Sequence, residues 1–453
     1  MDISGKKVLV YGTGLSGIAA AGLLLSKGAQ VTLFDENETP DRKRIFQEIG
    51  EEKEVRLVTG SLTEETLDSL DLVILSPGVP TDILNVEMIR ERQIPIWGEI
   101  ELGYQCEKGT ILAITGTNGK TTTTTLLGEI MKKSRSDVRI AGNIGIPYTQ
   151  EVKDSTDDTV MVAEISSFQL ETVNGFHPQV SAILNITPDH LNRHHTMENY
   201  TAAKLMIAKN QTEEDVCVLN YEDELLREHA GELRARIVWF SSRQRLDEGF
   251  YLDGDTIVCR EGEERIVLVH TDELNILGRH NHENVMAAAA MARAAGVSFD
   301  CIREVLKTFT AVEHRIEYVT EKRGIRFYND SKGTNPDAAI QAIRAMNRPT
   351  CLIAGGYDKQ SDFREWITSF DGKVKKLVLI GQTAEKIAAE AKQLGFFNYV
   401  FADSLQEAVE ICYQCAQAGD AVLLSPACAS WGMFPNYEVR GRMFKDMVHA
   451  LKE

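Results

Sequence analysis

The sequence has no apolar run long enough to cross a bilayer, and its first residues, Met1–Lys7, are polar. A membrane-spanning helix needs about 20 consecutive apolar residues, and a secretory signal needs a shorter apolar core close to the N-terminus. Because the sequence shows neither feature, we expect no membrane insertion and a cytoplasmic location.

Positive charge is also in short supply. The chain has 67 Asp and Glu residues against 49 Lys and Arg residues, which gives a formal net charge of −18. An acidic surface of this kind repels the phosphates of nucleic acids and of anionic membranes, so we expect neither as a partner. Small anionic substrates are still allowed, because backbone amides and one or two lysines hold phosphates locally.

The eight cysteines follow no disulfide spacing, and the sequence has no internal repeat and no low-complexity stretch. This cysteine usage is typical of a reduced, cytosolic chain. Cys412 and Cys415 form a CxxC pattern, but they lie in a helical pattern without a second pair of ligands. We therefore expect two core-facing thiols rather than a zinc or redox site.

The overall composition is that of a globular protein, with 43% hydrophobic and 26% charged residues, which excludes a disordered or fibrous chain. A length of 453 residues suggests roughly three domains. Strand and helix patterns alternate almost throughout, which predicts an α/β fold with mainly parallel sheets. We place the domain boundaries near residues 98 and 311, so that the expected domains are 1–98, 99–311 and 312–453.

The first domain carries a glycine fingerprint, Gly12-x-Gly14-x-x-Gly17, between the strand Lys7–Tyr11 and an apolar helix. Such glycines allow a tight turn and bring a diphosphate close to a helix N-terminus. Asp35 ends the next strand, where a carboxylate can accept a hydrogen bond from a ribose hydroxyl. The pattern favours a diphosphate site, and the alternative is a strand–helix turn that only needs small residues.

The second domain contains a stronger signal, Gly116–Thr121, after the strand Thr110–Ile114. The loop's amides can cradle phosphate oxygens, Lys120 can neutralise the β/γ charge, and Thr121 can ligate Mg²⁺. Ile114 stands where the usual Walker spacing has its first glycine, so the loop is a shortened relative of that motif.

Further polar residues follow predicted strands or precede helices. Glu164 ends a buried strand and is suited to Mg²⁺, although an isolated acid in a loop is the simpler interpretation. His190 is weak evidence alone, since we interpret its neighbours His194 and His195 as surface residues. Lys204 lies on a predicted helix, where a solvated lysine is the default. Asn284 precedes an Ala-rich helix and is alternatively an N-cap.

The third domain continues this pattern with four polar segments: His314-Arg315, Asn329–Asn335, Gly355–Lys359 and Ser425–Ser430. Most of them follow predicted strands, and the carboxyl ends of parallel strands form the ligand-binding edge of such sheets. Packing alone does not explain polar motifs at so many strand ends, so the sequence indicates an enzyme with binding residues in all three domains.

Taken together, these residues resemble the Mur ligase family, the ATP-dependent amide-forming enzymes of peptidoglycan precursor synthesis. The resemblance covers the whole chain and rests on Gly116–Thr121, Glu164, His190, Lys204, His280-Asn281 with Asn284, His314-Arg315 and Asp330–Lys332. It implies a Rossmann-like UDP-binding domain, a central ATPase domain and a C-terminal dinucleotide-fold domain.

Three stretches are similar to the branch of this family that adds D-glutamate: Glu164–Glu171, Asn329–Asn335 and Ser425–Ser430. The resemblance implies ATP and two small-molecule substrates, UDP-N-acetylmuramoyl-L-alanine and D-glutamate. The γ-phosphoryl group would pass to the L-alanyl carboxylate, and the amine of D-glutamate would attack the resulting acyl phosphate. We expect a monomer.

The resemblance also implies the nucleotide and metal sites. Thr121 and Glu164 would hold one Mg²⁺, and His190 and Lys204 would serve a second, with Mn²⁺ as an alternative metal. A lysine ammonium does not ligate a cation, so Lys204 is implied to be carbamylated by CO₂. The implied catalytic residues are Lys120, Glu164, His190 and Lys204, and the implied ATP-binding residues are Gly116, Thr117, Asn118, Gly119, Lys120, Thr121, Thr122, Asn284, Arg315 and Asp330.

The substrate residues come from the first and third domains. For the UDP-substrate they are Gly14, Leu15, Ser16, Asp35, Ser76, Pro77, Gly78, Asn143 and His190. For D-glutamate they are Lys332, Thr334, Lys359, Ser430 and Tyr437. Two departures stand out: Glu36-Asn37 replaces a hydroxyl residue and an arginine that some members carry, and Tyr437 stands where phenylalanine is common.

Three other functions fit parts of the sequence. An NAD-dependent dehydrogenase explains the fingerprint of the first domain but gives Lys120 and the third domain no role, and nicotinamide reduction would identify it. A P-loop motor or switch protein explains Gly116–Thr121 only, and it would hydrolyse nucleotide without an amino acid. A non-catalytic nucleotide-binding scaffold would show no turnover.

Overall fold

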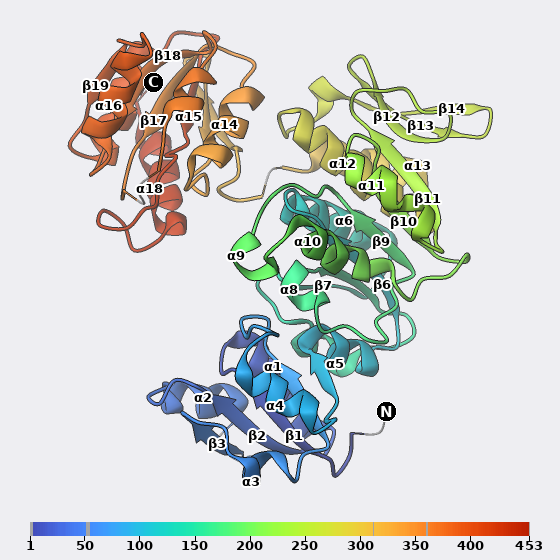
Figure 1. Cartoon of the computed structure of the whole chain (residues 1–453). Helices are drawn as coiled ribbons and strands as arrows, with labels where there is room; N and C mark the ends of the chain where they lie inside the picture. Colours follow the sequence, from blue (N-terminus) through green and yellow to red (C-terminus); the bar gives the residue numbers. More distant parts are fainter. Residues whose placement is uncertain (1–2, 51–54, 311, 359–360, 453) are drawn as a thin grey trace. The chain divides into compact units, whose positions relative to one another are not determined.

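The computed structural model describes residues 3–50, 55–310, 312–358 and 361–452. The chain divides into two compact units, one formed by Met1–Leu268 with Glu283–Val305 and the other by Val269–His282 with Leu306–Glu453. The described residues form three mainly parallel sheets with helices between the strands, which confirms the predicted α/β class (Figure 1).

The first sheet lies in the first unit, and all its neighbouring strands are parallel, in the order β3-β2-β1-β4-β5. Its central strands are short apolar runs that are buried on both faces, as parallel sheets require. The strands are β1 (Lys7–Tyr11), β2 (Gln30–Asp35), β3 (Arg56–Thr59), β4 (Leu72–Leu75) and β5 (Ile96–Gly98). The helices are α1 (Leu15–Ser26), α2 (Arg42–Ile49), α3 (Glu64–Leu67) and α4 (Leu84–Glu91).

The second sheet has the order β14-β13-β12-β11-β10-β9-β6-β8-β7. The pairs from β7 to β12 are parallel, and β12 and β13 form a hairpin around Asp253-Gly254, which the alternating pattern of Gly249–Cys259 predicts. The strands are β6 (Thr110–Thr115), β7 (Val138–Gly142), β8 (Val160–Glu164), β9 (Val180–Ile183), β10 (Val216–Asn220), β11 (Arg236–Ser241), β12 (Gly249–Asp253), β13 (Thr256–Glu261) and β14 (Glu264–His270).

The helices that accompany this sheet include the long α6, which follows the phosphate loop. They are α5 (Glu99–Cys106), α6 (Lys120–Ser134), α7 (Tyr148–Glu151), α8 (Ser167–Leu170), α9 (Leu191–His194), α10 (Met197–Leu205), α11 (Glu224–His229), α12 (Arg279–Ala294) and α13 (Phe299–Thr308). Among the described residues, no helix is long and apolar enough to cross a membrane.

The third sheet lies in the second unit, in the order β15-β16-β20-β17-β18-β19, with only the β15–β16 pair antiparallel. The strands are β15 (Glu317–Lys322), β16 (Ile325–Asn329), β17 (Thr350–Ala354), β18 (Val374–Leu379), β19 (Tyr399–Phe401) and β20 (Ala421–Leu424). The helices are α14 (Pro336–Ala345), α15 (Arg364–Thr368), α16 (Ala384–Gln393), α17 (Leu405–Cys415) and α18 (Tyr437–Ala450).

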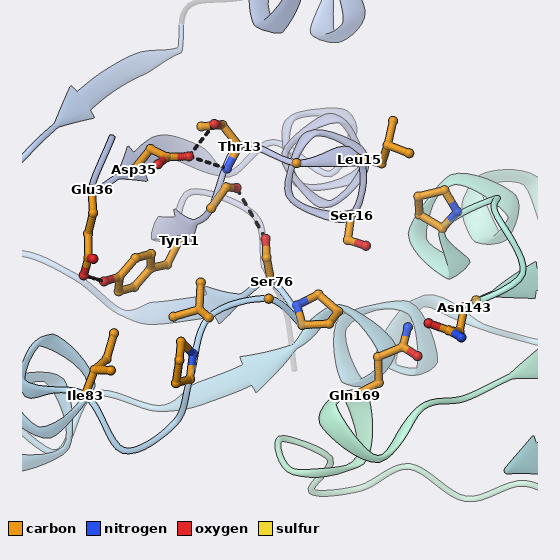
Figure 2. Close-up of a pocket in the computed structure, with 18 of the residues that line it drawn as sticks. Tyr11, Thr13, Leu15, Ser16, Asp35, Glu36, Ser76, Ile83, Asn143 and Gln169 are labelled. Carbon is orange, nitrogen blue, oxygen red and sulfur yellow. Dashed lines mark hydrogen bonds between the residues drawn. The ribbon is translucent and has the colours of Figure 1, made fainter. Parts of the chain in front are cut away.

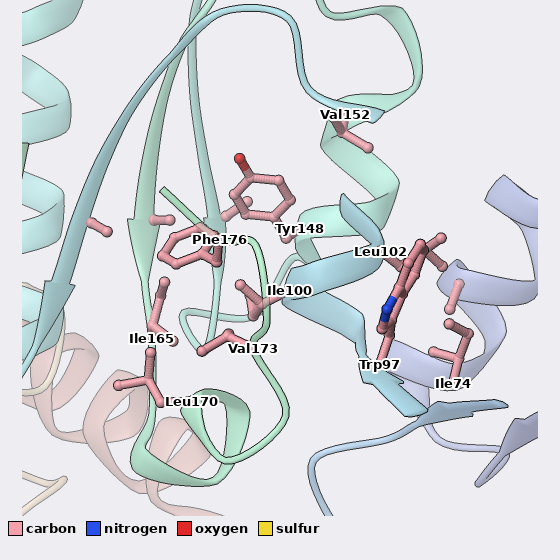
Figure 3. Packing of buried hydrophobic residues seen from close by; sticks show 14 of the residues in the cluster. Ile74, Trp97, Ile100, Leu102, Tyr148, Val152, Ile165, Leu170, Val173 and Phe176 are labelled. Atoms are coloured by element: carbon pink, nitrogen blue, oxygen red, sulfur yellow. The ribbon is translucent and has the colours of Figure 1, made fainter. Parts of the chain in front are cut away.

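The passage from the first sheet to the second is a packed helix rather than a linker. β5 runs directly into α5, and Trp97, Ile100 and Leu102 share one buried core with Tyr148 (Figure 3). Glu99 is buried and accepts hydrogen bonds from the backbone N–H and hydroxyl of Thr149, at 2.6 and 2.8 Å. Burial raises the pKa of the Glu99 carboxyl to about 6.

One helix boundary corrects the sequence interpretation. We considered Asn284 as an N-cap, but α12 begins five residues earlier, at Arg279. Asn284 therefore lies inside the helix rather than at its N-cap. Cys412 is buried on α17 and Cys415 is partly buried on the same helix, as expected for core-facing thiols.

Candidate active site

The phosphate loop connects β6 to α6. Gly116 and Gly119 have φ angles of +151° and +89°, a region that side-chain-bearing residues rarely adopt, so both positions need glycine. The Lys120 ammonium folds back over the loop and donates hydrogen bonds to the carbonyl oxygens of Gly116 and Thr117, at 2.8 and 2.9 Å. Lys120 therefore lies over the loop whose amides are expected to bind phosphate.

A second loop, which follows β9, holds the phosphate loop in place. The backbone N–H of Asn118 donates to Oδ1 of Asn185 at 2.8 Å, and Nδ2 of Asn185 donates back to the carbonyl of Asn118 at 3.1 Å. The Thr117 hydroxyl lies 3.1 Å from the hydroxyl of Tyr200 and donates to the carbonyl of Thr187. Hydrogen bonds to Asn185, Thr187 and Tyr200 therefore hold the phosphate loop in this conformation.

Asn284 approaches the phosphate loop from α12. Its Oδ1 atom accepts a hydrogen bond from the Thr123 hydroxyl at 3.3 Å. The same atom lies so close to Gly119 that a Cβ on that glycine would meet it at 2.2 Å. The structure therefore brings Asn284, predicted to bind ATP, next to the start of α6, where Thr121 and Thr122 occupy the first turn.

Glu164 ends β8, the strand next to β6, and only 2% of its surface is exposed. Its Oε1 atom accepts a hydrogen bond from the amide of Asn143 at 2.9 Å, while its Oε2 atom has no hydrogen-bond partner among the described residues. A buried carboxylate oxygen without a donor is costly unless a cation binds it. Glu164 therefore fits a Mg²⁺ ligand.

Lys204 is buried on α10, with 1% of its surface exposed, so the default interpretation as a solvated lysine is wrong. Burial and the nearby charge of Lys120 lower the pKa of its amine to about 7, and the charge of Asp189 acts in the opposite direction. Its Nζ atom lies 4.6 Å from the centre of the Tyr200 ring. The amine is partly uncharged near neutral pH, which is the form that reacts with CO₂.

His190 precedes α9 in a left-handed conformation, with φ at +53°, and its side chain is half exposed. Its ring centre lies 4.9 Å from that of Phe168, in the segment after Glu164. The next histidine, His194, was interpreted as a surface residue, but it is only 5% exposed. Its Nε2 atom forms a hydrogen bond with the Ser167 hydroxyl at 2.9 Å. The surface interpretation holds for His195 only.

A cleft with a volume of about 580 Å³ lies beside the glycine fingerprint (Figure 2). Loops after β1, β2 and β4 form one side, and residues that follow β7, together with Gln169, form the other. Of the nine predicted UDP-substrate residues, His190 does not line this cleft. The other eight do: Gly14, Leu15, Ser16, Asp35, Ser76, Pro77, Gly78 and Asn143.

The glycines of the fingerprint allow this cleft to form. A Cβ on Gly17 would meet the carbonyl oxygen of Gly12 at 1.9 Å, and one on Gly12 would meet the Ser76 hydroxyl at 2.8 Å. Asp35 accepts hydrogen bonds from the backbone N–H and the hydroxyl of Thr13, at 3.0 and 2.5 Å. Asp35 therefore also fixes the glycine loop, a role that the sequence did not reveal.

A polar cluster at the other end of the cleft involves Glu36, one of the departures from the family pattern. Oε1 of Glu36 accepts hydrogen bonds from the Tyr11 hydroxyl and from the amide of Asn85, the latter at 2.9 Å. Burial and the Glu36 carboxylate raise the pKa of Tyr11. Glu36 thus has local hydrogen-bond partners in this chain.

The second unit gathers its own set of predicted residues. β16, β20 and β17 are neighbours, so the segments after these strands meet at one edge of the sheet. They carry Lys332 with Thr334, Ser430, and the residues around Tyr357, whose N–H donates to the carbonyl of Ala429 at 2.9 Å. Lys359, also predicted to bind D-glutamate, lies outside the described residues.

Asp330 lies at the base of this edge, 6% exposed. Its carboxylate accepts hydrogen bonds from the Ser425 hydroxyl at 2.7 Å and from the N–H of Ile316 at 3.3 Å. Burial raises the pKa of Asp330 to about 7, and the nearby charge of Arg315 opposes that shift. Arg315, Asp330 and Ser425 are therefore grouped in the second unit.

A residue that the sequence interpretation missed connects this set. Arg440 on α18 is fully buried, and its guanidinium donates to the hydroxyl and the carbonyl of Ser331, at 2.9 and 2.8 Å, and to the carbonyl of Cys428 at 3.3 Å. The Ser331 hydroxyl donates to the carbonyl of Tyr437 at 2.8 Å. Burial lowers the pKa of Arg440 to about 10.

Three family models match successive parts of the chain. They are a Mur ligase MurD-like N-terminal domain at residues 6–98, a Mur ligase middle domain at residues 114–292, and a Mur ligase glutamate ligase domain at residues 314–428.

Curated relatives match over the full length. The UDP-N-acetylmuramoylalanine–D-glutamate ligase of Lachnoclostridium phytofermentans is 56% identical over 453 residues, and the match covers 100% of both chains. The ligases of the same name from Lachnospira eligens and Thermoanaerobacter pseudethanolicus are 54% and 48% identical, again over 100% of both chains.

Two solved structures share the fold. UDP-N-acetylmuramate–alanine ligase MurC from Thermotoga maritima has a TM-score of 0.60 at 20% identity and covers 99% of this chain and 100% of its own. MurF ligase from the same organism, solved in complex with ADP, has a TM-score of 0.58 at 17% identity and covers 98% of this chain and 96% of its own.

Proposed function

The chain belongs to the Mur ligase family, and on this basis we propose that it joins D-glutamate to UDP-N-acetylmuramoyl-L-alanine in the synthesis of peptidoglycan precursors. The reaction is an ATP-dependent amide ligation. A carboxylate is a poor electrophile, so the γ-phosphoryl group of ATP is first transferred to the L-alanyl carboxylate. The amine of D-glutamate then attacks the acyl phosphate, and phosphate leaves.

The protein's task in the first step is to align two polyanions and to neutralise their charge. The amides of the loop at Gly116–Gly119 would bind the phosphates, and Lys120 would turn from its own loop carbonyls to the β- and γ-phosphates. Asn284, beside the start of α6, would contact the same nucleotide. Arg315 and Asp330 would serve it from the second unit.

Magnesium is the cation that this chemistry calls for, because it offsets the negative charge of the transferred phosphoryl group. Glu164 would be its carboxylate ligand, since Oε2 has no other partner among the described residues, and Thr121 would supply a hydroxyl. Asn143 holds the other carboxylate oxygen, which fixes the orientation of Glu164.

Lys204 would act near His190 as a carbamate. The lowered pKa of the buried amine supplies the neutral form that CO₂ needs, and the product is an anionic oxygen pair in a position where the charge of Lys120 attracts it. The modification would therefore relieve the repulsion between the two lysines and create a ligand for a second cation.

The substrates would bind at the two sets of loops. The UDP-substrate would occupy the cleft beside the glycine fingerprint, and Asn143 would face its sugar and alanyl end. Lys332, Thr334, Ser430 and Tyr437 would bind D-glutamate, with a cation for one carboxylate and hydroxyl or backbone donors for the other. Lys359 is proposed as a further cation on the sequence pattern alone.

The observation that best supports this assignment is the position of Asn143. Asn143 lines the UDP-substrate cleft and at the same time donates a hydrogen bond to the buried Glu164. The end of the cleft that would receive the alanyl carboxylate is thus one side chain away from the acid proposed to hold Mg²⁺. A dehydrogenase or a nucleotide-hydrolysing switch protein has no use for this connection.

The test is phosphate release with UDP-N-acetylmuramoyl-L-alanine, ATP and Mg²⁺, measured with each candidate amino acid in turn. We expect release that depends on D-glutamate. L-Glutamate should be a poor substrate, because the inverted centre cannot keep its amine aimed at the acyl phosphate while both carboxylates stay bound. A preference for L-alanine or a diamino acid would move the chain to another branch of the family.

A further inference from the structure

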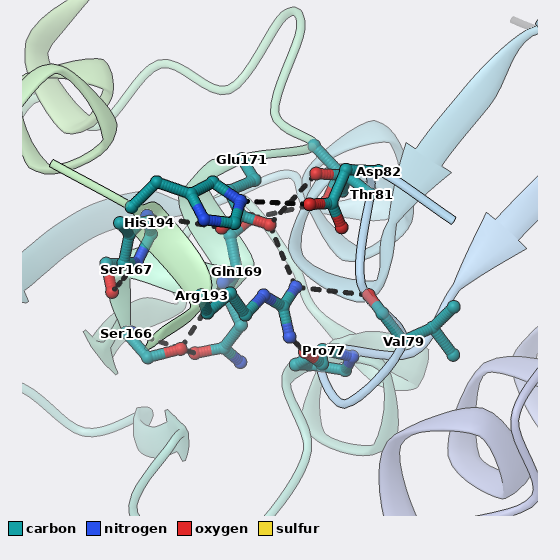
Figure 4. Close-up of polar contacts among 12 residues, drawn as sticks. Pro77, Val79, Thr81, Asp82, Ser166, Ser167, Gln169, Glu171, Arg193 and His194 are labelled. Atoms are coloured by element: carbon teal, nitrogen blue, oxygen red, sulfur yellow. Dashed lines mark hydrogen bonds and ion pairs between the residues drawn. The ribbon is translucent and has the colours of Figure 1, made fainter. Parts of the chain in front are cut away.

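Arg193 on α9 contacts the loop that forms one wall of the UDP-substrate cleft. Its Nη1 atom donates to the carbonyl oxygen of Pro77 at 2.8 Å, and its Nη2 atom donates to the carbonyl oxygen of Val79 at 3.1 Å (Figure 4). Pro77, Gly78 and Val79 all line the cleft. One guanidinium therefore fixes the orientation of two peptide groups in that wall.

The guanidinium is itself held from the other side. Nη2 donates to Oε2 of Glu171 at 2.8 Å, in an ion pair in which each side chain is 13% exposed. The Arg193 guanidinium also lies 4.1 Å from the centre of the Phe168 ring, a cation–π contact. Arg193 is thus a short bridge between the cleft wall and the segment that follows Glu164.

Phe168 also contacts His190, one of the proposed catalytic residues. Its ring centre lies 4.9 Å from that of His190 and 5.4 Å from that of His194. His194 in turn lies 5.1 Å from Tyr200, the residue that contacts both Thr117 of the phosphate loop and Lys204. A continuous row of packed side chains therefore joins the cleft wall to the phosphate loop.

From these contacts we infer that Arg193 is a positioning residue for the UDP-substrate, an inference that rests on the proposed function. Arg193 does not itself line the cleft. It holds the loop at residues 76–79 in the form that binds the UDP-substrate, and Glu171 holds Arg193 in that position. Carbonyl oxygens repel phosphate oxygens. Because the carbonyl oxygens of Pro77 and Val79 are bound to Arg193, the loop is held in an orientation that accepts a diphosphate.

Lysine cannot replace this arginine. The guanidinium serves three acceptors from a planar fork, whereas an ammonium is a point charge at the end of a flexible stem. Each charge-assisted hydrogen bond from the guanidinium stabilises the loop, and a free-energy loss of about 1.4 kcal/mol corresponds to a factor of ten in affinity. We expect a loss of at least about tenfold in apparent affinity for the UDP-substrate.

The experiment compares steady-state kinetics of the full chain for all three substrates. In Arg193→Met combined with Glu171→Gln, which leaves no unpaired buried charge, KM for the UDP-substrate should rise at least about tenfold. KM for ATP and for D-glutamate should change less than about twofold, because their proposed residues do not contact Arg193. Arg193→Lys should recover only part of the affinity.

Two matched controls separate positioning from general support of the fold. Arg90 donates a hydrogen bond to the carbonyl oxygen of Thr81 at 2.7 Å, close to the same loop. His195, which follows α9, pairs with Asp82, which follows β4, at 3.0 Å. Arg90→Met and His195→Gln should leave all three KM values unchanged. The thermal midpoint of each variant is recorded alongside.

Three results would overturn the inference. They are an unchanged KM for the UDP-substrate in the Arg193 variants, an equal rise of all three KM values, and the same selective rise in the His195 variant. Turnover of the unmodified chain with D-glutamate is the reference in every assay. If that reference activity is absent, the proposed function fails; if it is present and the Arg193 variants match it, only the inference fails.

Discussion

At the scale of single residues, Lys204 shows how burial changes the chemistry of a side chain. A lysine on the surface keeps its charge at every physiological pH and cannot be a metal ligand. The 1% exposure of Lys204 and the nearby charge of Lys120 remove that charge from part of the population near pH 7. The positive charge of Lys120, which disfavours a second ammonium beside it, favours an anionic carbamate at the same place.

We therefore predict that Lys204→Arg is as inactive as Lys204→Ala, although arginine keeps the positive charge. A loss of at least about 10²-fold in kcat is expected, the usual effect of removing a group that acts on the transition state. Acetate or formate should restore part of the activity of the alanine variant, because a small carboxylate can replace the carbamate oxygens.

A direct measurement accompanies the kinetics. With ¹³C-labelled bicarbonate, the native chain should give a carbamate carbon resonance that is missing from the Lys204→Ala chain. An active Lys204→Arg variant would show that positive charge is what the site needs, and the carbamate assignment would then be wrong.

Arg440 is a second residue whose role comes from burial. It connects Ser331, Cys428 and, through the Ser331 hydroxyl, Tyr437. These residues belong to three of the segments that carry the proposed D-glutamate residues. Among the residues that the structure describes, the hydrogen-bond acceptors of this guanidinium are carbonyl and hydroxyl oxygens, and Asp330 offsets its charge at longer range.

We predict that Arg440→Met raises KM for D-glutamate much more than KM for ATP. The variant should also lose about 2 kcal/mol or more of unfolding free energy, because several hydrogen bonds to a charged group disappear. Arg442→Met, at an exposed position of the same helix, is the matched control and should change neither quantity. Equal changes in the two variants would contradict the proposed role.

At the scale of elements, α12 begins with a group of titratable side chains. Burial lowers the pKa of His280 and of His282 to about 4, and neighbouring positive charges act in the same direction, from Arg315 on His280 and from Arg279 on His282. Both imidazoles are therefore neutral in the folded chain over a pH range in which they are protonated in the unfolded chain.

The sign of the resulting pH dependence follows. Below pH 6.5 the unfolded chain binds protons that the folded chain does not, so the stabilisation from the neutral histidines is complete above pH 6.5 and is lost as the pH falls toward 4. We predict that His280→Gln with His282→Gln reduces the loss of unfolding free energy between pH 6.5 and 4, measured by denaturant titration. An unchanged pH slope would contradict these pKa values.

The sequence predicted the position of the glycine-rich loop before α6, the position of Glu164 at the end of a buried strand and the β12–β13 hairpin, because each depends on residues that are close together in the chain. It did not predict that Lys204, His194 and Arg440 are buried. Lys204 and His194 are on short helices whose packing depends on distant segments, and Arg440 looks like a surface arginine until α18 is packed against the third sheet. The contact between Asn143 and Glu164 also required the β7–β8 pairing.

Three of the strands carry little signal in their local sequence. β3 and β15 are only partly buried and lack a clear apolar pattern, and β19 is three residues long. Pairing with a neighbouring strand, rather than local propensity, makes such segments into strands. Arg193 was missed because nothing in its neighbours indicates that Pro77 and Val79, more than a hundred residues earlier, supply its acceptors.

At the scale of the whole molecule, the proposed chemistry is divided between the two compact units. Lys120 and Glu164, which act on phosphoryl transfer, belong to the first unit, and Lys332 belongs to the second. The reaction has two stages that can be measured separately: formation of the acyl phosphate, which needs ATP and the UDP-substrate, and its attack by the amine of D-glutamate.

We predict that substitutions in the two units stop the reaction at different stages. Lys120→Ala should abolish formation of the acyl phosphate, since phosphoryl transfer loses the cation that neutralises its charge, at a cost of at least about 10²-fold. Lys332→Ala should still form the acyl phosphate and should fail in the attack by D-glutamate, because its ammonium is proposed to bind a carboxylate of the amino acid.

Borohydride reduction distinguishes the two variants, because it converts the acyl phosphate to an alcohol that mass spectrometry detects. In reactions without D-glutamate, the reduced product should appear with the native chain and with Lys332→Ala, and it should be missing with Lys120→Ala. Oxygen-18 placed in the L-alanyl carboxylate should reach inorganic phosphate in the complete native reaction, since the attacked carbon loses that oxygen with the phosphate. If Lys332→Ala yields no trapped product, Lys332 acts in phosphoryl transfer, and the proposed division between the units is wrong.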